Sequence, residues 1–183
     1  MGLEFIIIAS ITVNSIMDEC QDNYRYWDYL SPVERSIVLA SEKIDSVALM
    51  YYYESFSPSD NDTTFYLLDV LTNAKTEQEK CLYFWLFNRI LSSSDGALAE
   101  VLGPYCLKWI LSDSEYVCRH LYKYPDLEQE YSLKIAYSLM SEDPYSFNEL
   151  KKKLEGIISG RFLSIYLTSF LRKLESDMIL LKE

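Results

Sequence analysis

The chain has 183 residues, of which 49% are hydrophobic and 25% are charged. A chain of this length and composition can bury a core without disulfides or metals, which excludes an intrinsically disordered protein. Only five glycines and five prolines occur, too few for the many tight turns of a β-sandwich. We therefore predict a single all-α domain over residues 1–183, a compact irregular bundle of roughly seven to nine helices.

Acidic residues outnumber basic ones by 28 to 17, which gives a net charge of −11. Residues 1–92 contain 14 acidic and 6 basic residues and so carry −8 of that charge. A negative field repels nucleic-acid backbones and anionic membranes, and it speeds association with a basic protein. The charge therefore predicts a protein partner with a basic face and no nucleic-acid partner. Acidity that only keeps the protein soluble is the alternative.

The first apolar segment, residues 5–13, resembles the apolar region of a secretory signal. The residues before it include Glu4 but no Lys or Arg, and no small-x-small cleavage site follows. The segment is also too short to span a bilayer. We expect a buried first helix or strand, no membrane span and a cytoplasmic protein, because the four cysteines are too few and scattered for a disulfide scaffold.

A capping-box pattern, in which Ser or Thr is followed three residues later by Glu, begins at Ser31, Thr76, Ser112 and Ser146. In such a box the hydroxyl accepts a hydrogen bond from a backbone N–H, and the glutamate accepts one from the N–H of the cap residue. We predict a helix at each position. The first should run to about Ser55, because its apolar residues repeat every 3.6 positions.

Residues 56–62 form a loop by composition, with Asp62 as the predicted cap of the next short helix. Residues 81–87, in the helix after Thr76, are apolar on nearly all sides, which predicts a central buried helix. Further breaks between helices are predicted at Gly103-Pro104, Pro125, Asp143-Pro144 and Gly160. The spacing of the four caps also leaves open a HEAT-like stack of helical hairpins.

Candidate catalytic and metal-binding residues are few. His120 is the only histidine, which excludes di-histidine metal motifs, and we expect it at the surface near a helix end. Cys106, Cys118 and His120 lack the close Cys-x-x-Cys pair of a zinc site, and whether these two cysteines pair is left open. The five glycines are too dispersed for a phosphate-binding loop. The sequence predicts no enzyme, no cofactor and no metal.

Tyrosine occurs sixteen times, including the consecutive Tyr51, Tyr52 and Tyr53. Successive helical residues point about 100° apart, so some of these three must be partly exposed. Tyrosine is enriched at protein interfaces, although it also fills gaps between helices. The residues predicted to contact the partner are Asp18, Glu19, Asp22, Tyr24, Tyr26, Asp28, Tyr52, Glu54, Asp60 and Asp62.

These observations predict a protein that acts by stoichiometric binding, with exposed tyrosines as anchors and carboxylates for steering. The narrower hypothesis is a bacterial immunity-type protein that neutralises a cognate toxin or enzyme with a basic active-site face. The alternative is a helical adaptor or scaffold, HEAT-like, in a multiprotein assembly. A single acidic patch would favour the inhibitor, and a continuous concave surface shared by successive hairpins would favour the adaptor. The oligomeric state is not predicted.

Overall fold

The structure is a computed structural model that describes residues 24–141 and 147–182. Every regular element in these ranges is helical, which confirms the predicted all-α class. No helix within them combines the length and the apolar character needed to cross a membrane. The predictions for residues 5–13, for the capping box at Ser146 and for the break at Asp143-Pro144 lie outside the described residues.

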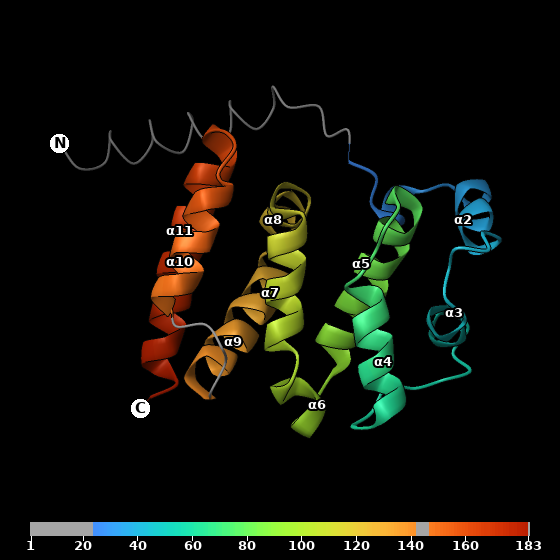
Figure 1. Cartoon of the computed structure of the whole chain (residues 1–183), viewed down its shortest axis with the longest axis horizontal. Coiled ribbons are helices and arrows are strands. Elements are labelled where there is room, and N and C mark those ends of the chain that lie inside the picture. Colours follow the sequence, from blue (N-terminus) through green and yellow to red (C-terminus); the bar gives the residue numbers. More distant parts are fainter. Residues whose placement is uncertain (1–23, 142–146, 183) are drawn as a thin grey trace.

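The helices form a row in space, with α10 and α11 at one end and α2 and α3 at the other (Figure 1). In chain order the elements are η1 (Trp27–Tyr29), α2 (Pro32–Leu39), α3 (Ser46–Tyr52), α4 (Asp62–Leu71), α5 (Glu77–Ser93), α6 (Gly96–Glu100), α7 (Gly103–Ser112), α8 (Ser114–Lys123), α9 (Pro125–Ser141), α10 (Phe147–Ile157) and α11 (Arg161–Leu180).

The capping boxes predicted at Ser31 and Thr76 both form. The Ser31 hydroxyl accepts a hydrogen bond from the backbone of Glu34, and the Glu34 carboxylate accepts one from the Ser31 N–H at 2.9 Å. The Glu79 carboxylate likewise accepts from the Thr76 N–H at 2.7 Å. Helices α2 and α5 therefore begin where the local pattern predicts.

Two other helix starts are shifted by one residue from the prediction. Ser112 completes α7, so the cap of α8 is Asp113, whose carboxylate accepts a hydrogen bond from the first turn at 3.2 Å. The cap of α4 is Asn61, whose side-chain oxygen accepts from the first turn at 2.9 Å, and Asp62 is the first helical residue. In both cases an Asp or Asn next to the predicted residue supplies the capping oxygen.

The single helix predicted from Ser31 to about Ser55 is wrong, because the segment forms α2 and α3 with a break between them. At the break, the Asp45 carboxylate caps α3 by accepting from the Val47 N–H at 2.9 Å. The N–H of Asp45 donates to the Tyr83 hydroxyl of α5 at 2.9 Å. A contact with a distant helix thus stabilises the break, which helical periodicity alone does not reveal.

The breaks predicted at Gly103-Pro104, Pro125 and Gly160 are confirmed, since α7, α9 and α11 begin at or directly after them. Gly160 adopts φ 132°, a conformation that favours glycine. Gly103 is required for a second reason. A Cβ atom there would overlap the carbonyl oxygen of Lys134 and the side chain of Ser138, so its absence lets α7 approach α9 closely.

Helix α9 lies at the centre of the contacts, because it packs against α5, α6, α7, α8 and α11. In a stack of repeats each unit contacts only its neighbours. In this protein several helices pack against the single helix α9, as in a helical bundle. The arrangement therefore fits the predicted bundle better than the HEAT-like stack.

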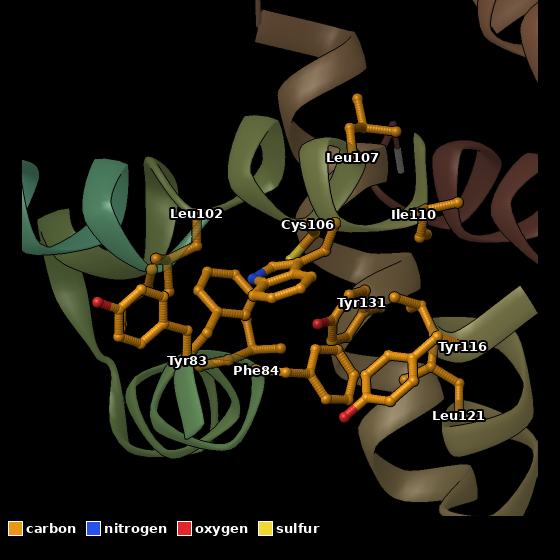
Figure 2. Close-up of a cluster of buried hydrophobic side chains, with 14 of the residues drawn as sticks. Tyr83, Phe84, Leu102, Cys106, Leu107, Ile110, Tyr116, Leu121 and Tyr131 are labelled. Atoms are coloured by element: carbon orange, nitrogen blue, oxygen red, sulfur yellow. The ribbon is translucent and has the colours of Figure 1, made fainter. Parts of the chain in front are cut away.

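The central core is built around the apolar run of α5. Residues 81–87 are buried except for the half-buried Trp85, as the sequence predicted for a central helix. The ring of Phe84 lies edge-on to Trp109 at 5.0 Å and to Tyr116 at 5.2 Å. Figure 2 shows side chains from α5, α7, α8 and α9 converging in this cluster.

Candidate functional site

Two neighbouring hollows on the surface share the side chain of Arg89 from α5. The first, which we name the His120 pocket, has a volume of about 450 Å³ and lies where η1, α5, α8 and the start of α9 meet. The second, which we name the acidic hollow, has a volume of about 630 Å³ and lies between the loop after α3 and the connection from α5 to α6. Because Arg89 lines both, they form adjacent parts of one face.

Aromatic rings form a large part of the wall of the His120 pocket. The imidazole of His120 contacts the rings of Tyr26 at 4.7 Å, Tyr124 at 4.6 Å and Phe84 at 5.0 Å. The hydroxyls of Tyr29 and Tyr124 form a hydrogen bond of 3.2 Å, which fastens η1 to the end of α8. The aromatic residues of the wall are Tyr26, Trp27, Phe84, Trp85, His120 and Tyr124.

The expectation that His120 lies at the surface is wrong. Its side chain is near the end of α8, as expected, but only 7% exposed, because the rings of Tyr26, Phe84 and Tyr124 pack against it. Its Nδ1 is buried without a hydrogen-bond partner. Burial, followed by the nearby charge of Lys123, lowers the pKa of His120 to about 4. The imidazole is therefore neutral near pH 7, with a hydrogen-bonding position unfilled.

Charged groups around the His120 pocket balance one another. Asp28 and Asp126 supply two negative charges, and Arg89 and Lys123 supply two positive ones. Arg89 and Lys123 already lie over aromatic rings of the protein, at 5.0 and 5.7 Å from ring centroids. The pocket thus has apolar walls and no net charge at its edge.

The acidic hollow has the opposite character. It is lined by the carboxylates of Glu54, Asp60 and Asp95 and by one cation, Arg89, so its net charge is −2. Glu54 and Arg89 are 3.5 Å apart, and serine side chains supply much of the remaining polar lining. Such a hollow favours a cationic group, because three carboxylates compete for a single arginine.

Glu54 has an unfavourable backbone conformation, with φ 58°. It follows the end of α3, where the N–H of Ser55 donates to the carbonyl of Met50 at 2.9 Å and the N–H of Glu54 donates to that of Tyr51 at 3.1 Å. Glycine is the usual residue at the left-handed position of this helix ending. A side chain there costs about 1 kcal/mol, and such strain is concentrated at functional sites.

The structure brings some of the acidic residues predicted to contact a partner together and separates others. Glu54 and Asp60 meet in the acidic hollow, and Asp28 lies at the edge of the His120 pocket. Asp62 is exposed at the start of α4 but does not line either hollow. The predicted contacts Asp18, Glu19 and Asp22 lie outside the described residues.

The predicted tyrosine anchors are mostly packed within the protein. Tyr26 is only 2% exposed, so its prediction as an exposed anchor is wrong, and its hydroxyl donates to the carbonyl of Tyr116 at 2.8 Å. Tyr24 is half-buried with its ring edge-on to that of Tyr116 at 5.7 Å. Tyr52 is half-buried against Trp27 at 5.7 Å. These rings stabilise the position of η1, and Tyr24 and Tyr52 remain partly exposed.

The prediction for the three consecutive tyrosines is confirmed. Tyr51 is buried, Tyr52 is half-buried and Tyr53 is 63% exposed. Since successive helical side chains diverge by about 100°, one helix end supplies both a core residue and a surface residue.

Three residues of the two hollows were not predicted from the sequence: Trp85, Arg89 and Asp95. Arg89 follows Trp85 by four positions in α5, a spacing that places both on one side of a helix and could have revealed the pair. Asp95 meets Asp60 only because the chain folds the end of α5 against the loop after α3. No local pattern signals that contact.

Within residues 24–141 and 147–182, no three His, Cys, Asp or Glu side chains gather closely enough to hold a metal ion. Cys106 and Cys118 are buried and free, so they do not form a disulfide with each other. Burial raises the pKa of both thiols, which disfavours the reactive thiolate. These cysteines are therefore core residues.

No protein-family model, no curated protein and no solved structure matches this chain. We therefore infer its function from the two hollows and from the charge of the chain.

Proposed function

We propose that the protein acts by stoichiometric binding of another protein, without catalysis, and that the acidic hollow receives basic side chains of the partner. The observation that carries this proposal is the gathering of Glu54, Asp60 and Asp95 around the single cation of Arg89. Carboxylates form strong, charge-assisted hydrogen bonds with lysine and arginine side chains. The hollow therefore matches a protruding basic residue of a partner.

Two further features support this proposal. The net charge of −11 attracts a basic partner over a distance of about 8 Å at physiological salt. Glu54 keeps a charged side chain at a left-handed position that glycine would occupy at a lower energetic cost. A functional need for that carboxylate accounts for the unfavourable backbone.

The narrower proposal is an immunity-type inhibitor of a toxin or enzyme with a basic active-site face. An acidic protein that covers such a face blocks access of an anionic substrate and needs no catalytic group of its own. Its support is the acidic hollow together with the overall charge. An adaptor that joins several proteins remains the alternative proposal, and the number of captured partners separates the two.

The proposal is tested first by capture from a lysate of the source organism, with the tagged protein as bait and elution by a salt gradient. We expect one basic partner in a stoichiometric amount, and an inhibitor requires that the purified partner loses an activity when bound. Several partners held together would indicate the adaptor.

Charge reversal then tests whether the acidic hollow is the interface. We expect the double variant Asp60→Lys, Asp95→Lys to associate with the captured partner about tenfold more slowly at low salt, because electrostatic steering is reversed there. The matched control is Glu155→Lys, Glu175→Lys, since these exposed residues of α10 and α11 lie at the opposite end of the row (Figure 1). Both variants change the net charge equally. Equal association rates for the two would remove the hollow from the interface.

A further inference from the structure

We propose that the His120 pocket binds a small, neutral, planar aromatic molecule that carries one hydrogen-bonding group, as phenols and indoles do. This site adjoins the acidic hollow and shares Arg89 with it, but the inference does not depend on the proposed protein partner. Size, wall chemistry, hydrogen bonding and charge each limit the class of ligand.

The size of the pocket fits a small molecule. Its volume of about 450 Å³ falls within the range of about 300–1,000 Å³ that is typical of ligand sites. The wall is rigid on one side, because Trp27 and Phe84 are 2% exposed and belong to the packed core. Core packing therefore fixes this side of the pocket.

The wall favours an aromatic ring. Trp27 and Trp85 line the pocket with their ring centroids 5.8 Å apart and their planes tilted by 39°. A third ring placed against tilted indoles makes offset or edge-to-face contacts, which stabilise aromatic clusters beyond the burial of area. The imidazole of His120 already contacts the rings of Tyr26, Phe84 and Tyr124, so the ligand ring is expected to contact the indoles instead.

Two polar groups in the wall can form hydrogen bonds with a ligand. The imidazole of His120 is 7% exposed, and its Nδ1 has no hydrogen-bond partner. Asn88 lines the pocket, and its Oδ1 accepts a hydrogen bond from the Tyr131 hydroxyl at 2.9 Å, which leaves its amide nitrogen to donate. A buried polar atom without a partner is energetically costly. A ligand with one hydroxyl or N–H group relieves that cost.

Charge excludes strongly ionic ligands. The two carboxylates and two cations around the pocket cancel, so neither sign is attracted by a net charge. A cationic ligand would also have to displace Arg89, which lies 5.0 Å from the ring centroid of Trp85. A neutral molecule meets no such competition.

The test uses the isolated full chain and 4-methylphenol as the probe, with the indole N–H signals of the three tryptophans followed by NMR. We expect the Trp27 and Trp85 signals to shift in a saturable way at millimolar probe concentration. The Trp109 signal should stay in place, because Trp109 does not line the pocket. No saturable shift, or equal shifts of all three signals, would overturn the proposal.

Two variants make the test specific. Ser92→Phe places a ring in the mouth of the pocket and should abolish binding, while Ser169→Phe makes the same change on the exposed surface of α11 and should not. His120→Phe keeps a ring and removes the imidazole nitrogens, so affinity for 4-methylphenol should fall about fivefold while affinity for toluene stays unchanged. Binding that is insensitive to Ser92→Phe, or an equal loss for both probes in His120→Phe, would contradict the assigned site or its hydrogen bond.

Discussion

Replacing His120 with phenylalanine should remove a specific acid sensitivity from the protein. The side chain is 7% exposed, and burial together with the charge of Lys123 lowers its pKa to about 4. In the unfolded chain the same imidazole has its ordinary pKa of about 6.5. His120→Phe keeps the aromatic contacts with Tyr26 and Tyr124 and removes both the ionisable group and the unpaired Nδ1.

The size of the effect follows from the two pKa values. Because the folded pKa of His120 is lowered, the unfolded state binds a proton first as the pH falls below about 6.5. The free energy of unfolding is thus fully retained above that pH and decreases between about pH 6.5 and about pH 4. At pH 5 the pH is about 1.5 units below the unfolded pKa and still above the folded one. Each pH unit in this range costs about 1.4 kcal/mol, so the free energy of unfolding should be about 2 kcal/mol lower at pH 5.

Urea unfolding of the wild type and of His120→Phe, at about pH 7.5 and about pH 5, measures this loss of stability. Carboxylates titrate in both proteins, so their contribution cancels when the wild type is compared with His120→Phe at each pH. The wild type should lose about 2 kcal/mol more than the variant between the two pH values. A difference below about 0.5 kcal/mol, within the scatter of surface substitutions, would refute the burial of a neutral imidazole at this position.

Three further predictions concern backbone positions. Glu54→Gly should stabilise the protein by about 1 kcal/mol, because glycine adopts φ 58° without strain. The same variant should weaken binding of the partner. A loss of stability would show that the contacts of the Glu54 side chain outweigh the backbone strain. Gly103→Ala should destabilise the protein by about 2 kcal/mol or more, because the added Cβ overlaps α9. In Gly156→Ala the added Cβ meets open space in α10, so this variant should stabilise the protein by about 0.5 kcal/mol. Urea unfolding measures the stability of both glycine variants. Equal effects of the two substitutions would argue against the close approach of α7 and α9.

The residue pattern by itself determined the features that depend on short stretches of chain. The starts of α2 and α5 follow from the capping boxes at Ser31 and Thr76, whose hydrogen bonds join residues three positions apart. The starts of α9 and α11 follow from Pro125 and Gly160. The burial of residues 81–87 follows from an apolar run with no polar side. In each case the deciding interactions lie within one or two helical turns.

The tertiary structure alone decided which of these elements meet. The break between α2 and α3 is stabilised by the Tyr83 hydroxyl, 38 positions from Asp45. The His120 pocket depends on η1 reaching α8, where the Tyr26 hydroxyl donates to the Tyr116 carbonyl 90 positions away. Hydrophobic burial favours many such pairings equally, because it has no direction. Only the packed arrangement of all the helices therefore fixed which tyrosines were buried, that His120 became neutral, and where the carboxylates gathered.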